Sequence, residues 1–379
     1  MARIAISGTG FIGTGLALAL ASHPRLSVSA VLTRRPPSTV QHPYPDLLNN
    51  NIDHSLNHCD LLVECSGDVL HATTVIDAAL RRNIPVITMN AEFHVTVGSA
   101  FVERGYLSEA EGDQPGCLAA LDRRVRDMGF TPVVYGNIKG FLNHTPSPED
   151  MQFWANKQGI RLEQVTAFTD GSKVQIEQAF VANGLGADIL APGLSGPHST
   201  TLEATSLALA AEAESRGAQP ISDYVLNPGG PAGVFIVARH HPGQQRFLEY
   251  LKLGPGPHYF LLQPFHLCHL EIARSIEAAL AGAPPLLNNS RTPRVGVVAI
   301  AKKSLPCGHH IERALGSFEF RGEATSFADH HQWVPIGLLQ HARLRTPVEA
   351  GQRLRWDQVE LPPSLALTLF QQLLTETPR

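Results

Sequence analysis

A glycine-rich turn in the first 21 residues constrains the fold of this chain more than any other feature. Residues 3–6 form an apolar run of strand type, residues 15–21 are rich in alanine and leucine, and Gly8, Gly10 and Gly13 lie between them. A strand, a G-x-G-x-x-G turn and a helix, in that order, are the context of a dinucleotide-binding fingerprint. The three glycines allow a tight turn, room for a pyrophosphate, and close packing of helix on strand. The pattern therefore predicts a helix N-terminus that holds the phosphates of a dinucleotide.

The end of the second predicted strand, residues 27–32, indicates which dinucleotide binds. An NAD-specific domain usually has Asp or Glu here, about twenty residues after the glycines, to hold the ribose 2′-hydroxyl. This chain has Thr33, Arg34 and Arg35 instead. Two guanidinium groups and a hydroxyl suit a 2′-phosphate, so the sequence favours NADP(H) over NAD. The alternative is that both arginines are only solvated loop charges.

The composition is that of an ordinary globular protein. The chain has 379 residues, 43% of them hydrophobic and 17% charged, which allows two or three domains with full cores. A net charge of −4 gives no basic footprint for nucleic acid or for a membrane surface. The early start of the first strand and the lack of a long apolar run predict a cytoplasmic protein with no membrane contact. Five scattered cysteines are expected to be reduced thiols.

Alternating elements continue after the fingerprint. Residues 60–65 and 84–89 read as buried parallel strands with a helix between them, so the fold class is α/β with a doubly wound Rossmann sheet. Ligands bind at the carboxyl ends of such strands, which places Ser66, Gly67, Asn90 and Glu92 near the nicotinamide. For Ser66 and Gly67 a plain strand-to-helix turn explains the residues equally well.

The second third of the chain carries the candidate catalytic residues. We expect helices over residues 117–128 and 148–160 and strands over 131–135 and 164–168. Asp170, Lys173 and Glu177 are three and four residues apart, so on one helix they would share a face and hold a cation for proton transfer. A surface salt bridge explains the same spacing without chemistry.

Several motifs together resemble the homoserine-dehydrogenase-like oxidoreductases that carry a C-terminal SAF domain. No single motif is specific, but the combination is, and it covers nearly the whole chain. The matching segments are residues 8–13, 111–116, 136–140, 170–173, 254–259, 264–267 and 301–308.

The resemblance implies an NADPH-dependent oxidoreductase acting on a small polar carbonyl compound or alcohol. One branch of the family is similar to 1-deoxy-D-xylulose 5-phosphate reductoisomerase, which makes 2-C-methyl-D-erythritol 4-phosphate for isoprenoid biosynthesis with a divalent cation. Homoserine dehydrogenase itself reduces an aldehyde with a lysine and acidic residues in its substrate domain. A dehydrogenase of a small aldehyde or hydroxy acid, and a non-catalytic nucleotide sensor or scaffold, are the alternatives. The resemblance favours a catalytic role for Asp170, Lys173 and Glu177 over a surface salt bridge. It also implies that Lys139 is a site residue.

One departure from the family pattern bears on the substrate. Gln263 precedes the Pro264-Phe265-His266 element where the family commonly has arginine, and an amide cannot replace a guanidinium clamp on phosphate. The sequence therefore supports a phosphorylated substrate less strongly than it supports the oxidoreductase class.

The metal content is left open by the sequence. His266, Cys268 and His269 lack the spacing of zinc ligands. Carboxylates such as Glu92, Asp113 or Glu177 would suit Mg²⁺ or Mn²⁺, bound only when the substrate is present. For His266, a core histidine and a substrate contact are equally favoured.

These observations predict three domains and three sets of site residues. We expect a dinucleotide-binding Rossmann domain over residues 1–135, an α+β substrate and homodimerisation domain over 136–291, and a β-clip SAF domain over 292–379. Pro284, Pro285 and Pro293 mark the second boundary. The predicted catalytic residues are Lys173 as primary donor, Asp170, Glu177 and Lys139. The predicted cofactor contacts are Gly8, Thr9, Gly10, Phe11, Ile12, Gly13, Thr33, Arg34, Arg35, Ser66, Gly67 and Asn90. The predicted substrate contacts are Glu92, Asp113, Asn137 and His266.

Overall fold

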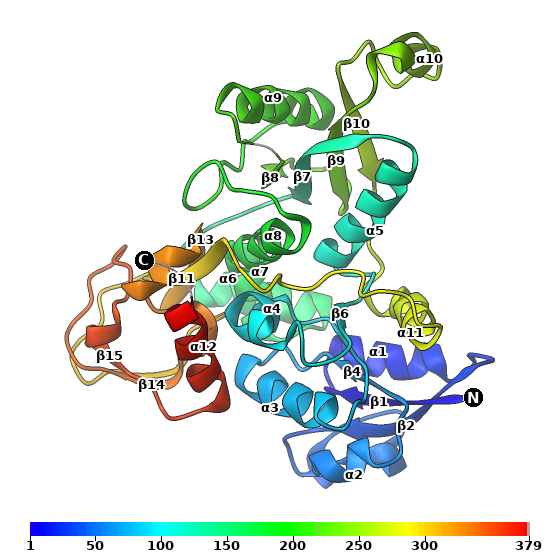
Figure 1. Cartoon of the computed structure of the whole chain (residues 1–379). Coiled ribbons are helices and arrows are strands. Elements are labelled where there is room, and N and C mark those ends of the chain that lie inside the picture. Colours follow the sequence, from blue (N-terminus) through cyan, green and yellow to red (C-terminus); the bar gives the residue numbers. More distant parts are fainter. Residues whose placement is uncertain (219, 377–379) are drawn as a thin grey trace. The chain divides into compact units, whose positions relative to one another are not determined.

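A computed structural model describes residues 1–218 and 220–376 of the chain (Figure 1). It divides into two compact units, each assembled from separate stretches of sequence. The first unit contains residues 1–116, 267–292 and 363–376. The second unit contains residues 117–266 and 293–362, apart from the undescribed residue 219.

The first unit is built on a six-stranded parallel sheet with the order β3-β2-β1-β4-β5-β6. Its order reverses beside β1, which is the doubly wound arrangement the sequence predicts. The α/β fold class is therefore confirmed. The strands are β1 Ala2–Ser7, β2 Leu26–Leu32, β3 Leu48–Asn49, β4 Leu61–Glu64, β5 Val86–Thr88 and β6 Leu107–Glu109.

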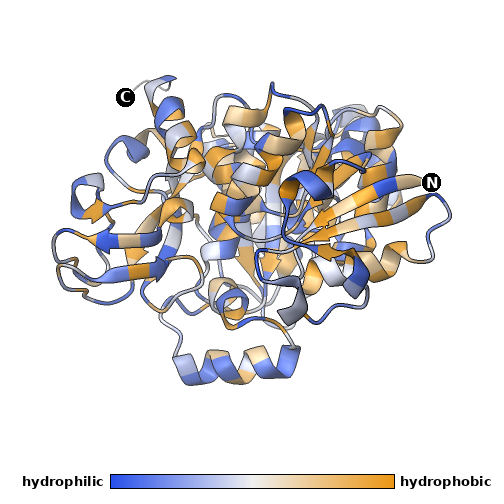
Figure 2. Cartoon of the chain, turned by 90° about the horizontal axis from the view of Figure 1, so that it is seen from below, coloured by the Kyte–Doolittle hydropathy of each residue, from blue (hydrophilic) through white to orange (hydrophobic). Residues whose placement is uncertain are grey.

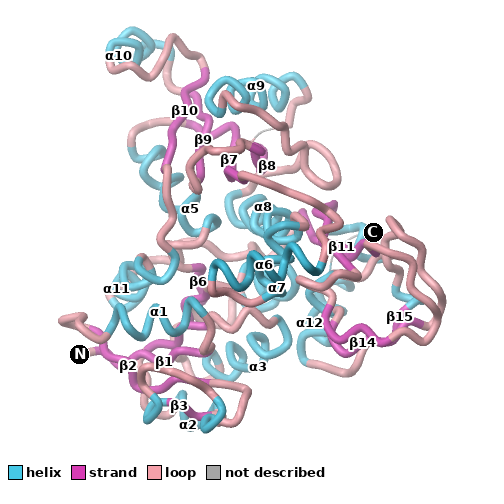
Figure 3. The backbone as a smooth tube through the Cα atoms, turned by 180° about the vertical axis from the view of Figure 1, so that it is seen from behind, coloured by secondary structure: helices cyan, strands magenta, loops and turns pink. Residues whose placement is uncertain are grey.

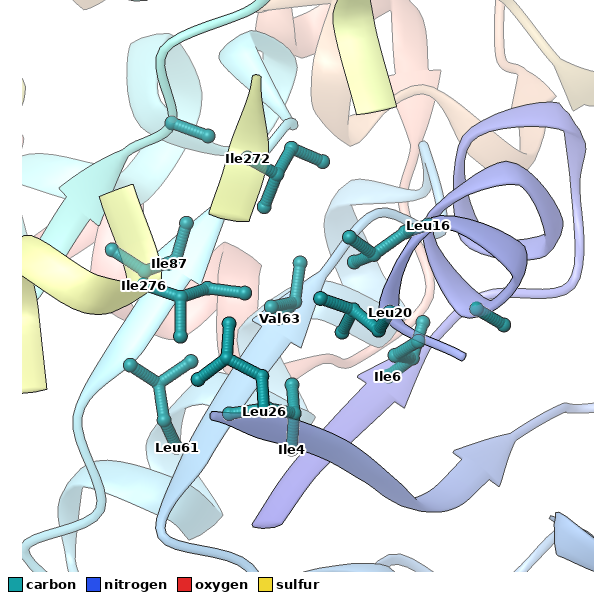
Figure 4. Packing of buried hydrophobic residues seen from close by; sticks show 12 residues of the cluster. Ile4, Ile6, Leu16, Leu20, Leu26, Leu61, Val63, Ile87, Ile272 and Ile276 are labelled. Atoms are coloured by element: carbon teal, nitrogen blue, oxygen red, sulfur yellow. The ribbon is translucent and has the colours of Figure 1, made fainter. Parts of the chain in front are cut away.

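The core of this unit lies between one face of the sheet and two helices, α1 (Phe11–Leu20) and α11 (Ile272–Leu280). Figure 4 shows Leu16 and Leu20 of α1 beside Ile6, and Ile276 of α11 beside Ile87. Alternate residues of the strands face these helices because successive strand side chains point to opposite faces. Figure 2 shows hydrophobic residues along much of the strands beside the N-terminus.

Further helices of the first unit come from both ends of the chain. The C-terminal helix α12 packs against α3 and α4 and buries Ala366, Leu369, Phe370 and Leu373 at helical spacing. The remaining α-helices are α2 Ile52–Leu56, α3 Val69–Leu80, α4 Ala91–Val97 and α12 Leu365–Glu376. Short 3-10 helices span Pro37–Thr39, Pro45–Leu47, Gly98–Phe101 and Cys268–Leu270.

The second unit contains a mixed four-stranded sheet with the order β10-β9-β7-β8. β7 runs parallel to β8 and antiparallel to β9, and β10 pairs antiparallel with β9. The strands are β7 Thr131–Lys139, β8 Ile221–Leu226, β9 Val234–Arg239 and β10 His258–Gln263. The helices are α5 Gln114–Asp127, α6 Pro148–Gln158, α7 Leu162–Thr169, α8 Ser172–Leu185, α9 Leu202–Ser215, α10 Gln245–Tyr250 and the 3-10 turn Pro242–Gln244.

The rest of the second unit, residues 293–362, is rich in β-structure joined by long loops, as Figure 3 shows. β11 pairs antiparallel with β13, and β14 pairs antiparallel with both β12 and β15. The strands are β11 Val295–Ala301, β12 His310–Arg313, β13 Phe320–Ser326, β14 Gln340–Leu344 and β15 Val359–Glu360. Short 3-10 helices span Phe327–His331, Ile336–Leu338 and Trp356–Gln358.

The division into units differs from the predicted boundaries. The expected boundary after residue 135 falls inside β7, and the first unit's opening stretch already ends at residue 116. Because β7 pairs on both edges with strands of the second sheet, it belongs with them. The expected module 292–379 is also divided, since 293–362 belongs to the second unit and 363–376 to the first.

The predicted strand at residues 164–168 is wrong, because this segment lies in helix α7. A short apolar run does not distinguish a strand from a helix by itself. Gln164 accepts a hydrogen bond from the backbone N–H of Arg161 at 3.4 Å and so closes the first turn of the helix. Val165 then packs with Met151 and Ala155 of α6, and this helix–helix contact decides the outcome.

Candidate functional site

The fingerprint turn has the backbone geometry that its glycines require. Gly8 has φ +127°, and a Cβ there would lie 2.8 Å from the carbonyl oxygen of Cys65. A Cβ on Gly13 would lie 2.1 Å from the carbonyl oxygen of Gly8. Both positions therefore exclude a side chain, and α1 packs directly on the turn that follows β1.

The N-terminus of α1 fits the pyrophosphate of a dinucleotide. Gly10 is the N-cap and supplies no side-chain cap, and the first turn of α1 carries no acidic residue. The first N–H groups of a helix have no intrahelical acceptor, and the helix dipole favours an anion beside them. Residues 8–13 would therefore hold the phosphates through backbone N–H groups, with Thr9, Phe11 and Ile12 completing the turn.

Thr33 and Arg35 link the end of β2 to the fingerprint turn. The buried Thr33 hydroxyl accepts a hydrogen bond from the Arg35 backbone N–H at 3.2 Å. The Arg35 guanidinium then donates to the hydroxyl of Thr9 at 3.1 Å. Arg35 thus lies beside the turn that would hold the phosphates, where a 2′-phosphate needs a cation.

Arg34 has a different setting from its neighbour. Its guanidinium forms an ion pair of 2.8 Å with Asp68, whose side chain is fully buried. Asp68 also caps α3 by accepting a hydrogen bond from the backbone N–H of His71. Part of the Arg34 charge is therefore neutralised within the protein, which the sequence pattern did not reveal.

Glu64, at the carboxyl end of β4, organises the predicted nicotinamide end of this unit. Its buried carboxylate accepts hydrogen bonds from the Ser66 backbone N–H at 2.9 Å and the Asn90 side-chain amide at 3.0 Å. Burial raises the pKa of Glu64 to about 7, although both hydrogen bonds oppose the rise. Sequence reasoning passed over Glu64 as an ordinary strand residue.

The Asn90 side chain has two contacts within the protein, and its predicted contact with the cofactor stays a prediction. Asn90 is fully buried, its amide nitrogen donates to Glu64, and its oxygen accepts from the backbone N–H of Phe93 to cap α4. The side chain is thus used within the protein, because it joins the ends of two neighbouring strands. The predicted contacts of Ser66 and the exposed Gly67 with the cofactor stay predictions.

The four predicted substrate contacts fall into both units. Glu92, in the first turn of α4, and Asp113, whose carboxylate accepts from the Gln114 backbone N–H, belong to the first unit. Asn137 in β7 and the half-buried His266 belong to the second. Asn137 contacts one of the predicted catalytic side chains.

That contact is to Glu177 in α8, which has a fully buried carboxylate. One of its oxygens accepts hydrogen bonds from the Asn137 amide at 2.9 Å and from the Lys139 ammonium at 3.0 Å. The Lys139 side chain is 14% exposed, whereas that of Glu177 is fully buried. The other Glu177 oxygen and the Asn137 oxygen are buried without a hydrogen-bond partner. A strand and a helix far apart in sequence thus hold one ammonium group at a defined place.

Asp170 lies in a second buried ion pair. Its carboxylate is 2.5 Å from the ammonium of Lys302, which follows β11 and is 3% exposed. The other carboxylate oxygen accepts from the Ser172 backbone N–H at 2.8 Å. Burial raises the pKa of Asp170 and lowers that of Lys302, and the attraction between the two charges opposes both changes.

The expected single face of Asp170, Lys173 and Glu177 is therefore corrected in part. α8 begins at Ser172, so Asp170 ends α7 and lies outside the helix, because the left-handed Gly171 separates the two helices. Asp170 forms its ion pair with Lys302, and Glu177 forms its ion pair with Lys139. Lys173 is half-buried in the first turn of α8, one turn before Glu177, and its catalytic role stays a prediction.

Lys302 and Arg124 were missed by sequence reasoning. The Arg124 guanidinium donates to the side-chain oxygen of Gln263 at 2.5 Å, so a cation from α5 lies beside the amide that departs from the family pattern. Lys302 and Arg124 each contact a residue more than a hundred positions away in the sequence, and no local pattern shows such a contact. The available signals for Lys302 were its place at the end of a strand and within the matching segment 301–308.

Metal binding gains no support from the structure. Within residues 1–218 and 220–376, no three or more His, Cys, Asp and Glu side chains converge on a position where they could hold an ion. Over the same described residues, no helix has the length and apolar character to cross a membrane.

The comparisons with known proteins agree with this chemistry. Residues 112–272, less than half of the chain, match the family described as "Oxidoreductase DRL, catalytic domain". Together with the fingerprint turn, this match decides the class. The chain is an NAD(P)-dependent oxidoreductase. No curated protein matches the sequence significantly.

Solved structures of dehydrogenases match this chain at low similarity. UDP-N-acetylglucosamine 3-dehydrogenase from Acidithiobacillus ferrooxidans is 12% identical with a TM-score of 0.43, over 76% of this chain and 92% of that one. A hyperthermophilic archaeal homoserine dehydrogenase in complex with NADPH is 12% identical with a TM-score of 0.42, over 75% of this chain and 99% of that one. Similarity at this level does not establish a shared substrate.

Proposed function

We propose that the oxidoreductase uses NADPH to interconvert a small polar carbonyl compound and its alcohol. The observation that carries the proposal is the buried Glu177 carboxylate, which holds the Lys139 ammonium beside the first turns of a helix that also carries Lys173. NADPH, when bound at residues 8–13 and Arg35, supplies the hydride. The remaining task, control of charge and protons at the carbonyl oxygen, belongs to side chains of the protein.

The proposed roles follow from the charge that develops on that oxygen. Hydride addition makes the carbonyl oxygen negative, so a cation or proton donor within hydrogen-bond reach lowers the barrier. Lys173 is the proposed donor. Lys139, held by Glu177 and Asn137, is proposed to bind an anionic or hydroxyl group of the substrate, and Asp170 to fix the turn that opens α8.

The substrate itself is proposed from the family resemblance. 1-Deoxy-D-xylulose 5-phosphate, converted to 2-C-methyl-D-erythritol 4-phosphate, is the first compound to test, and small aldehydes and hydroxy acids are the second group. Arg124 beside Gln263 leaves a guanidinium near the position where the family pattern has one. We also propose that residues 293–362 are the SAF region and that the enzyme is a homodimer.

Two lysine variants test the assignment. Loss of an electrostatic donor costs about two to three orders of magnitude in turnover, so Lys173→Met should lower kcat by that factor without changing NADPH affinity. Lys139→Met should act mainly by raising KM. Lys157→Met, a change on the exposed face of α6, is the matched control. The rates are measured by the absorbance of reduced nicotinamide, and NADPH affinity by calorimetry.

The outcomes separate the roles of the two lysines. Near-normal turnover by Lys173→Met contradicts its role as donor. If Lys139→Met abolished turnover while Lys173→Met stayed active, Lys139 would be the donor and Lys173 the residue that binds the substrate.

A further inference from the structure

Helix α8 is held at several points by the β-structure of residues 293–326. Ser172 accepts a hydrogen bond from the Gly322 backbone N–H, and Gln175 accepts one from that of Ala324, both at 2.8 Å. Nearer the other end, Asn183 donates to the Val295 carbonyl and accepts from the Val295 backbone N–H, at 2.8 and 2.9 Å. These neutral contacts run along the helix that carries Lys173 and Glu177.

Lys302 adds a single charged contact at the start of the helix. Its ammonium lies 2.5 Å from Asp170 and donates to the Ser317 carbonyl at 2.6 Å, so its place is fixed on two sides. Asp170 in turn caps the Ser172 N–H, one residue before Lys173. The turn at Gly171, with φ +86°, therefore depends on a carboxylate whose countercharge comes from residues 293–326.

The electrostatics of this pair are demanding. Asp170 is fully buried, and an ionised carboxylate in such a place is costly unless it is paired. The Asp170 carboxylate faces the Lys302 ammonium and the backbone N–H of Ser172. The backbone carbonyl oxygen of Asp170 lies 3.0 Å from a ring nitrogen of His144. Arg321 contributes a further positive field at Lys302.

We infer that Lys302 is a positioning residue for catalysis: its ammonium pairs with the buried Asp170 carboxylate and so fixes the turn that places Lys173 and Glu177. This inference deepens the proposed function and rests on it. It gives residues 293–326 a part in the chemistry, since they supply the countercharge of the site in α8.

The test compares Lys302→Met with Lys303→Met. Lys303 is the next residue, with a side chain 55% exposed and a single long ion pair of 3.7 Å to Glu319, so it controls for loss of a lysine in the same loop. We expect Lys302→Met to lower kcat at least tenfold. Its NADPH affinity should stay unchanged within twofold, because the fingerprint residues 8–13 belong to the other unit. Lys303→Met should leave all constants unchanged within twofold.

A pH profile distinguishes positioning from simple support of the fold. Lys302 opposes the rise in the Asp170 pKa, so Lys302→Met should leave Asp170 protonated over a wider pH range. The kcat of Lys302→Met should therefore be lowest at low pH and rise as the carboxylate ionises, more steeply than that of the wild type. Asp170→Asn/Lys302→Met removes the buried charge and should recover Tm and lose the added pH dependence, while kcat stays low. Full recovery of kcat in this double variant, or an unaltered kcat in Lys302→Met, would overturn the inference.

Hydrogen exchange gives a readout that needs no substrate. In Lys302→Met the amides of residues 172–176 should exchange at least tenfold faster, while those near Asn183 keep their protection because their neutral contacts remain. Unchanged exchange at 172–176 contradicts the inference whatever the substrate. A wild-type enzyme that turns over none of the carbonyl compounds tested contradicts the proposed function instead.

Discussion

At the scale of single residues, charges of the same kind have different surroundings. Arg34 is paired with the buried Asp68, whereas Arg35 reaches the hydroxyl of Thr9 in the fingerprint turn. Lys139 and Lys302 each have a buried carboxylate as partner. Which cation is available to a ligand therefore depends on neighbours distant in sequence.

Arg35→Ala should weaken NADPH binding more than Arg34→Ala. A hydrogen bond to a charged group contributes about 1.5–3 kcal/mol, which corresponds to at least a tenfold loss of NADPH affinity. Arg34 is already partly neutralised, so its removal should cost less. Calorimetric titration of both variants with NADPH and NADH checks this, and equal weakening of the two cofactors by Arg35→Ala would refute a 2′-phosphate contact.

The raised pKa of Glu64 predicts a pH-dependent stability. The folded-state pKa of about 7 lies above the ordinary value of 4.5, so the folded protein binds this proton more tightly than the unfolded chain does. The stabilisation is complete below about pH 4.5 and is lost as pH rises to about 7. The free energy of unfolding should therefore fall by roughly 2 kcal/mol between pH 5 and 8 through this group.

Glu64→Gln checks this assignment, because glutamine has the same shape and does not titrate. Chemical unfolding of the variant and the wild type at both pH values should show a smaller pH effect in the variant. The same slope in both proteins would mean that Glu64 is not the titrating group.

At the scale of elements, the position of α1 depends on contacts that leave no room for side chains. Gly13→Ala would bring a Cβ against the Gly8 carbonyl, and this backbone cannot move without opening the turn. We expect the variant to lose at least tenfold in NADPH affinity and to be less stable. Gly140→Ala, where nothing lies within 4 Å of the added Cβ, is the control. Equal NADPH affinity of Gly13→Ala and the wild type would contradict the close-packed turn.

At the scale of the whole molecule, helix α12 belongs to the same unit as the first strand β1. Phe370 of α12 is fully buried against the first unit, and truncation of such a residue costs about 3–5 kcal/mol. Phe370→Ala should therefore destabilise the first unit and speed hydrogen exchange in α3 and α4. The exposed Gln371→Ala should not. Faster exchange confined to residues 293–362 would instead place α12 with that region.

The sequence by itself determined the parts of the protein that depend on local chemistry. The fingerprint glycines, the alternation of strands and helices and the arginines after β2 are all short-range patterns, because a turn, a helix start or a strand end is specified by a few neighbouring residues. These patterns were sufficient for the Rossmann sheet and for the oxidoreductase class. The partners of Glu177 lay within motifs that the sequence also singled out, but their contact with Glu177 did not follow from those motifs.

Tertiary structure alone decided how distant residues combine. Residues 164–168 form a helix because Val165 packs on α6, and β7 joins the second sheet because it pairs with β8 and β9. Asp170 is paired with Lys302, 132 positions away, and Arg34 with Asp68. A buried charge must find its countercharge wherever the fold brings one, and that choice depends on long-range packing that no local spacing encodes.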